Sequence, residues 1–225
     1  MASKEEPVMG LVRTQDLTVS WISESGIRDT NTDRVCILTM ANGQVRLTMQ
    51  AATLNLRGFR LTKGHMCVFA LFEACDPGSG DAADKASELF MNTIMKYDIT
   101  KKPAKDVIKK CLSKTDKALS KEIKDAKYKA SIAAFASKDL TVCSINGGRI
   151  FIVPDDGKTK EYSAPETEFL PIGNSWKDVM MVSDGYPIRV DEVKEDMRSP
   201  IGDLITKREF RMLNDSVSMI RVQRL

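Results

Sequence analysis

The chain has 225 residues, of which 42% are hydrophobic, and a formal net charge of +3. This length suits one domain with a single substantial core better than two domains. The sequence contains no run of eighteen apolar residues and no apolar run behind a basic N-terminal stretch. We therefore expect neither a membrane span nor a secretion signal, and we expect an intracellular protein, in the cytoplasm or another compartment. The five cysteines are scattered without a CxxC pair, which argues against a disulfide framework or a structural zinc site.

The first third of the chain has the pattern of strands separated by turns. Alternating or β-favouring residues predict strands at residues 18–22 and 34–40, on either side of the polar loop 23–33. Asn42-Gly43 predicts a tight turn that leads into a further strand at residues 45–49. The uninterrupted apolar run at residues 67–72 predicts a buried central strand.

Two helices follow, and then a second group of strands. Apolar positions three and four residues apart predict one helix capped by Ser79 or Asp81 and another after Pro103. The rest of the chain predicts strands at 131–136, 140–145, 149–153 and 178–182, a helical stretch at 193–210 that Pro200 kinks or divides, and a closing strand at 217–222. Strand and helix do not alternate regularly, so we expect an α+β domain in which antiparallel sheets are layered with helices. It would span residues 16–225, behind an N-terminal extension of residues 1–15.

Residues 101–129 form the most basic part of the chain, with eleven lysines and four acidic residues. The helix that carries them has either a solvated face or a docking surface for an acidic partner, such as a protein surface or a cytoskeletal assembly. Few aromatic residues are interleaved with the lysines, so we do not expect nucleic-acid binding.

Short polar motifs recur at the ends of the predicted strands. In chain order they are residues 26–33 with Arg28, then Phe72-Glu73-Ala74-Cys75, Ala130-Ser131-Ile132-Ala133, Asn146-Gly147-Gly148-Arg149, Ser183-Asp184-Gly185 and Asn214-Asp215-Ser216. This ordered set resembles the motifs of the metal-dependent type-2C serine/threonine protein phosphatases, from about Ser20 to Leu225. The resemblance implies a four-layer α-β-β-α domain, an antiparallel β-sandwich flanked by helices on both faces. It also implies chemistry in which carboxylates bind two Mg²⁺ or Mn²⁺ ions that activate a water molecule.

Carried over residue by residue, the resemblance assigns metal-binding roles to three carboxylates. Glu73 takes the position of the bridging ligand, and Asp184 and Asp215 are the other remaining ligands, so one metal ion at most is implied. Asp33 falls in the outer shell. A second register, in which Asp76 replaces Glu73 as the bridging ligand, also aligns without a gap.

Other positions of the resemblance depart from the family pattern. Arg28 falls on the phosphate-binding Arg, but Thr32 replaces an acid and Gly147 replaces an Asp. Cys75 takes the place of the His that acts as general acid. Only 24 residues separate Val153 from Asp178, where the family carries a longer stretch that includes a substrate flap.

These departures favour a catalytically impaired phosphatase-like protein that serves as a binding, scaffold or structural module in a protein assembly. The alternative is a divergent Mg²⁺- or Mn²⁺-dependent protein phosphatase with a one-metal centre at Glu73, Asp184 and Asp215. A third hypothesis is a phosphate or phosphopeptide sensor that uses Arg28 without hydrolysis. We expect no cofactor, or at most one Mg²⁺ or Mn²⁺ held weakly.

Overall fold

The structure is a computed structural model that describes residues 7–25, 31–41, 44–49, 52–56, 66–75, 80–97, 101–136, 139–209 and 215–225. In chain order its strands and helices are β1 (Val8–Arg13), β2 (Leu17–Glu24), β3 (Arg34–Ala41), β4 (Gln44–Met49), β5 (Ala52–Leu56), β6 (Met66–Ala74), α1 (Gly80–Ile94), α2 (Ala104–Glu122), β7 (Tyr128–Ala136), β8 (Asp139–Ile145), β9 (Arg149–Val153), β10 (Lys160–Tyr162), β11 (Glu168–Gly173), β12 (Asp178–Val182), α3 (Val193–Arg198), α4 (Ile201–Lys207) and β13 (Val217–Arg224).

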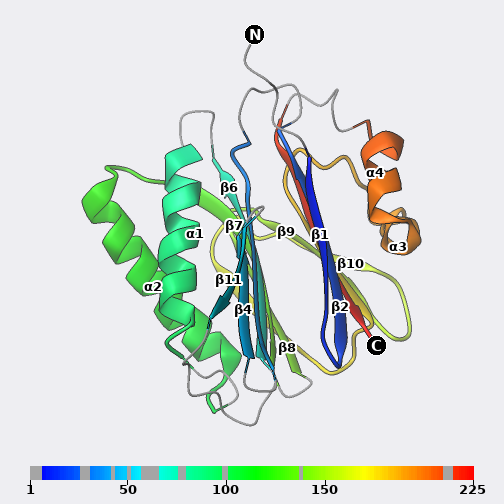
Figure 1. Cartoon of the computed structure of the whole chain (residues 1–225), viewed down its shortest axis with the longest axis horizontal. Helices are drawn as coiled ribbons and strands as arrows, with labels where there is room; N and C mark the ends of the chain where they lie inside the picture. The colour runs from blue at the N-terminus through cyan, green and yellow to red at the C-terminus, as the bar shows by residue number, and fades with distance from the viewer. Residues whose placement is uncertain are drawn as a thin grey trace.

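Two antiparallel sheets lie face to face between two layers of helices. One sheet has the strand order β1-β2-β13-β12-β9-β10, and the other has the order β11-β8-β7-β6-β3-β4-β5. Figure 1 shows α1 and α2 on the outer side of the seven-stranded sheet, with α3 and α4 beyond the six-stranded one. The predicted α+β sandwich with helices on both faces is therefore confirmed.

The apolar residues divide into three layers because each sheet is covered on both of its faces. On β6, Val68, Ala70 and Phe72 belong to the layer under α1 and α2. The alternate residues Cys67, Phe69 and Leu71 belong to the layer between the sheets. A strand with two buried faces has no polar alternation, which explains the continuous apolar run that marked this strand in the sequence.

The helical stretch near the C-terminus consists of two short helices. Helix α3 ends at Arg198 and α4 begins at Ile201, with Ser199 and Pro200 between them. Proline has no N–H to donate to the preceding turn, so the chain divides at this point, which was one of the two predicted outcomes. Among the described residues, no helix is both long and apolar enough to cross a membrane.

The N-terminal boundary needs a correction. Residues 8–13 were assigned to an extension, but they form β1, an edge strand that pairs with β2 in antiparallel register from Val8↔Ser23 to Arg13↔Thr18. Gly10 lies against the indole of Trp21, where a Cβ atom would come within 2.1 Å of the ring. A glycine among the inward positions, with Met9 and Leu11 exposed on the other face, hides the alternation typical of a strand.

Candidate functional site

Ends of strands from both sheets meet around one polar pocket. The seven-stranded sheet contributes the start of β3, the end of β6 and the start of β7, and the six-stranded sheet contributes the end of β12 and the start of β13. The pocket has a volume of about 150 Å³ and is lined by Thr32, Asp33, Glu73, Ala74, Cys75, Lys129, Asp184, Gly185, Asp215 and Ser216. Four carboxylates and one lysine therefore converge on a small space.

Glu73 lies at the floor of this pocket and links the two sheets. Its side chain is buried, and its Oε2 accepts a hydrogen bond of 2.8 Å from the backbone N–H of Asp184. The second oxygen, Oε1, is also buried and has no hydrogen-bond partner among the described residues. Burial raises the pKa of Glu73 well above its ordinary value, and the nearby charge of Asp33 raises it further. A buried carboxylate oxygen without a donor is costly, so Glu73 is a candidate binding group.

Asp33 is a second buried carboxylate in the same pocket. Burial raises its pKa to about 7, and the charge of Asp215 adds to the effect, while hydrogen bonds with Ser183 and Ser218 and the charge of Arg34 oppose it. Asp33 and Glu73 are both buried and close enough for their charges to interact, so they cannot both ionise at low cost. Strong perturbation of neighbouring carboxyl groups in a pocket is characteristic of functional sites.

Small polar side chains fix the loops that carry these acids. The hydroxyl groups of Ser23 and Ser218 lie 2.6 Å apart on the paired strands β2 and β13, and Asn31 donates to Ser23 at 2.7 Å. The Oδ1 of Asn31 in turn accepts the backbone N–H of Asp33 at 2.9 Å. The backbone N–H of Thr32 donates to Ser216 at 3.0 Å, next to Asp215. These hydrogen bonds join the start of β3 to the start of β13, so Asp33 and Asp215 are held on one side of the pocket.

Among the described residues that line the pocket, Lys129 is the basic one. Its place in the pocket was not predicted from the sequence. Helix α2 ends at Glu122, so Lys129 belongs to β7, where it stands directly opposite Glu73 of β6. Its ammonium group forms an ion pair with Asp184. In the sequence, Lys129 follows the lysines of the preceding helix and was predicted to belong with them. The available signal was its place one residue before Ala130-Ser131, at the sheet end that also carries Glu73.

The structure brings most of the predicted site residues together. Glu73, Asp184, Asp215, Asp33 and Cys75 all line the pocket. The roles assigned to them remain predictions.

Other predicted positions lie elsewhere. Arg28 and Asp76 fall outside the described residues. Gly147 occupies a turn with φ of +92° that begins after β8, and it does not line the pocket.

The donor chemistry of the pocket suits a hard divalent cation. Mg²⁺ and Mn²⁺ prefer carboxylate oxygens, and the buried Oε1 of Glu73 is an oxygen that still lacks a donor. Within the described ranges, no three His, Cys, Asp or Glu groups are already spaced to hold a metal ion. By charge and donor type, however, the lining fits such a cation, and Asp33, Glu73, Asp184 and Asp215 are the groups that would hold it.

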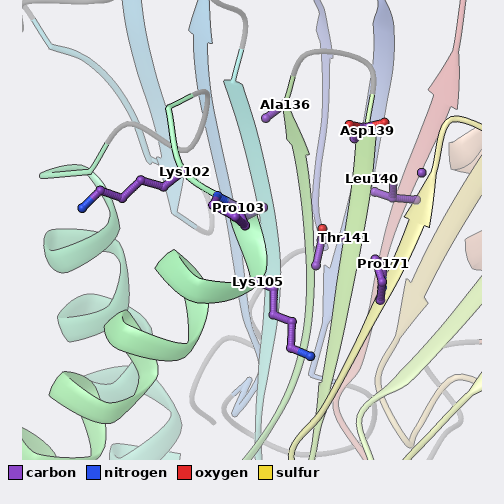
Figure 2. Close-up of a pocket in the computed structure, with 10 residues that line it drawn as sticks. Lys102, Pro103, Lys105, Ala136, Asp139, Leu140, Thr141 and Pro171 are labelled. Atoms are coloured by element: carbon purple, nitrogen blue, oxygen red, sulfur yellow. The ribbon is translucent and has the colours of Figure 1, made fainter.

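A larger cavity of about 460 Å³ lies far from these carboxylates in the fold. It is bordered by the first turn of α2 with Lys102, Pro103 and Lys105, and by the strands that carry Thr141 and Pro171. Figure 2 shows these side chains around the space between the helix and the sheet. Among the described residues its lining contains a single acid, Asp139, and neither histidine nor cysteine.

Comparison with known proteins identifies the fold. No protein-family model and no curated protein matches the sequence. Among solved structures, RsbX in complex with magnesium has a TM-score of 0.61 at 10% identity, over 96% of this chain and 100% of that one. The catalytic domain of the serine/threonine phosphatase PstP in complex with two manganese ions has a TM-score of 0.63 at 14% identity, over 93% and 99%. PppA of Pseudomonas aeruginosa has a TM-score of 0.66 at 11% identity, over 98% and 100%.

The chain thus has the fold of the type-2C, metal-dependent serine/threonine phosphatases, as the ordered motifs suggested. One expectation is corrected by these structures. We expected no cofactor, or at most one weakly held cation, but two structures with this fold contain magnesium or manganese, and one of them holds two manganese ions. Proteins with this fold thus bind divalent cations in these two structures, which contradicts the expectation.

Proposed function

We propose that this protein is a catalytically impaired type-2C phosphatase-like protein, which binds a divalent cation in the carboxylate pocket and serves as a binding module in a protein assembly. The observation that carries the proposal is the ammonium group of Lys129 among the four carboxylates, paired with Asp184. A fixed positive charge in this position weakens the field that the carboxylates exert on a cation. Less negative charge remains to hold a full set of catalytic ions.

The chemistry of the pocket supports this proposal from a second side. A bound Mg²⁺ or Mn²⁺ would supply Lewis acidity and lower the pKa of water. Glu73 and Asp184 would supply oxygens to that cation, and the serine hydrogen bonds around Asp33 would hold this acid in place. Cys75 lines the pocket at the position where the resemblance places a proton-donating His. A thiol with an ordinary pKa of about 8.5 is a poorer acid at neutral pH than imidazolium, whose pKa is about 6.5.

For the binding role, the outer face of α2 is the surface we propose. The helix buries Val107, Ile108, Cys111, Leu112, Thr115 and Leu119 against the core. Its lysines, including Lys109 and Lys117, point outward and are exposed. Acidic protein surfaces match such a face through long-range attraction. Replacement of Lys109 and Lys117 by Glu should then weaken binding of an acidic polypeptide such as polyglutamate at low salt, whereas equal binding by the variant would leave this face without a binding role.

The proposal is tested by heating the protein with and without Mn²⁺ while its phosphatase activity is measured in parallel. At an Mn²⁺ concentration about one hundred times Kd, the cation should stabilise the fold by about 2.7 kcal/mol. For a protein of this size that raises the Tm by roughly 5–10 °C. Asp184→Asn should reduce the shift, while Asp191→Asn, at an exposed aspartate outside the pocket, should retain it.

Activity separates this proposal from its alternative. Hydrolysis of p-nitrophenyl phosphate or of a phosphoprotein should be no faster for the wild type than for Asp184→Asn. Mn²⁺-dependent turnover that this substitution abolishes would instead establish a divergent metal-dependent phosphatase. Absence of any Mn²⁺-dependent Tm shift would refute cation binding.

A further inference from the structure

Lys129 reaches the carboxylate pocket because of the register between two central strands. Residues directly opposite on antiparallel strands project to the same face of the sheet and lie about 5 Å apart at Cβ. Lys129 and Glu73 form such a pair on β7 and β6. From this position the lysine side chain extends to Asp184, which follows β12 of the other sheet. The pairing of two strands in one sheet thus delivers a cation to an acid of the second sheet.

The lysine side chain is held within the pocket rather than spread over the surface. Only 24% of the side chain of Lys129 is exposed, against 42% for Asp184. The ordinary pKa of a lysine side chain is about 10.4, and Lys129 forms an ion pair with Asp184. Lys129 is consequently a cation at neutral pH.

The charges of the lining residues explain what this cation does. Asp33, Glu73, Asp184 and Asp215 bring four acidic groups to a pocket of about 150 Å³, and among the described residues that line it Lys129 is the one basic residue. Without a positive charge, acids at such close quarters repel one another. The ammonium group offsets part of this repulsion in the absence of any bound ion.

A divalent cation and the lysine cannot use the same acid in the same way. An oxygen of Asp184 that pairs with the ammonium group is not available to a metal ion, and two positive charges within a few ångströms repel each other. We infer that Lys129 is a tethered counter-ion of the pocket, which competes with a divalent cation for Asp184 and sets the affinity of the site for Mg²⁺ or Mn²⁺. This inference rests on the cation-binding part of the proposed function.

The competition has a measurable size. The protein binds Mn²⁺ only in those molecules in which Lys129 has released Asp184. The apparent Kd therefore equals the intrinsic Kd divided by the fraction of molecules in that state. Loss of a partly exposed ion pair changes an equilibrium by up to about fivefold, and removal of a like charge adds to the effect. The substitution Lys129→Gln should therefore tighten Mn²⁺ binding by about three- to tenfold, since 1.4 kcal/mol corresponds to tenfold.

The test measures Mn²⁺ affinity by calorimetry, and independently by the electron paramagnetic resonance signal of free Mn²⁺, for the wild type and three variants. Lys129→Gln removes the tethered charge. Lys129→Arg retains a cation at the same place and should bind Mn²⁺ about as weakly as the wild type. Lys127→Gln is the matched control, because Lys127 is exposed two residues earlier and does not line the pocket. Circular dichroism and urea unfolding confirm that each variant is folded.

The outcomes separate this inference from the proposed function. The inference is supported if Lys129→Gln binds Mn²⁺ more tightly than the wild type and the other two variants do not. It is also supported if Lys129→Gln binds Mn²⁺ and the wild type does not bind it at all. In that second case, the cation binding proposed for the wild type is refuted. Equal Mn²⁺ affinity in the wild type and Lys129→Gln overturns the inference and leaves cation binding intact. Failure of all four proteins to bind Mn²⁺ at about 10 mM overturns both. If Lys129→Gln fails to fold, tighter binding by Lys129→Arg than by the wild type also overturns the inference.

Discussion

Asp196 offers the sharpest test of how α3 and α4 are fixed to the six-stranded sheet. Its side chain is fully buried, and its carboxylate accepts hydrogen bonds from the hydroxyl of Tyr186 at 2.7 Å and from Lys207 and Arg208 at 3.0 Å each. The backbone carbonyl of the same residue accepts a bond of 2.7 Å from Arg221 of β13. One residue therefore joins both helices to the sheet, and we predict that Asp196→Ala is strongly destabilising.

The magnitude follows from the groups that the substitution would leave without partners. The hydroxyl of Tyr186 is buried with its residue, and a buried donor without an acceptor costs about 1–3 kcal/mol. The side chain of Arg208 is only 11% exposed and would lose its ion pair with Asp196, but it would keep its ion pair with Glu192 at 3.2 Å. The cost therefore lies below the upper end of the about 3–5 kcal/mol for a buried charge left without any partner. Lys207 is 34% exposed and keeps its ion pair with Glu195, so it adds little. We expect a loss of about 2–4 kcal/mol.

Urea unfolding followed by tryptophan fluorescence is the appropriate assay, since Trp21 and Trp176 are both buried between the sheets. The control is Asp191→Ala, because Asp191 pairs with Arg189 at 3.8 Å and both side chains are more than three-quarters exposed. Surface pairs of this kind contribute about 0–1 kcal/mol. A loss below about 1 kcal/mol for Asp196→Ala, or one equal to that of the control, would refute the role assigned to this residue.

The same site has a predictable dependence on pH. Burial would raise the pKa of Asp196, but the hydrogen bonds from Arg208, Tyr186 and Lys207 outweigh it and hold the pKa below its ordinary value of 3.8. A carboxyl group with a lowered pKa in the folded state contributes stability above pH 3.8 and loses it as the pH falls through the folded value. The stability gap between wild type and Asp196→Asn should be constant from pH 7 to about pH 5 and narrow only below about pH 4. A gap that narrows near pH 6 would contradict this assignment.

Two further predictions concern a pair of glycines, Gly148 and Gly202, and the reactivity of the five cysteines. A Cβ atom on Gly148 would lie 2.2 Å from the carbonyl oxygen of Ala130, so Gly148→Ala should cost about 1–3 kcal/mol in urea unfolding. At Gly202 in α4 there is nothing within 4 Å of that position, so Gly202→Ala should stabilise the protein by about 0.5–1 kcal/mol, and equal effects at both glycines would be inconsistent with the packing described. Titration of the native protein with a thiol reagent should modify only the partly exposed Cys75, because burial raises the pKa of the other thiols to about 11 or 12. Rapid labelling of more than one thiol in the native protein would contradict the burial of Cys36, Cys67, Cys111 and Cys143.

Much of the architecture could be predicted from local patterns. The apolar run corresponds to β6, which is buried on both faces, and the periodic apolar positions correspond to α1 and α2, which bury one face each. Burial therefore leaves a direct trace in the sequence. Residues Ala41 and Gln44 pair across the turn predicted at Asn42-Gly43, which itself lies outside the described residues. Strands β10 and β11 were not predicted, because both are edge strands without apolar alternation. β10 has only three residues, and β11 contains Pro171 and mostly half-buried side chains.

Local patterns in the sequence predict most of the elements in order and place Glu73, Asp184 and Asp215 at the ends of strands. Which of these ends meet depends on the packing of the sheets, because β6 and β12 belong to different sheets and their acids approach each other only when the two sheets pack. The same holds for the position of Lys129. In the sequence this residue ends a run of lysines typical of a solvated helix, whereas strand pairing places it opposite Glu73 and within reach of Asp184. Charge is readable from residue types alone, but which charges face one another is a property of the fold.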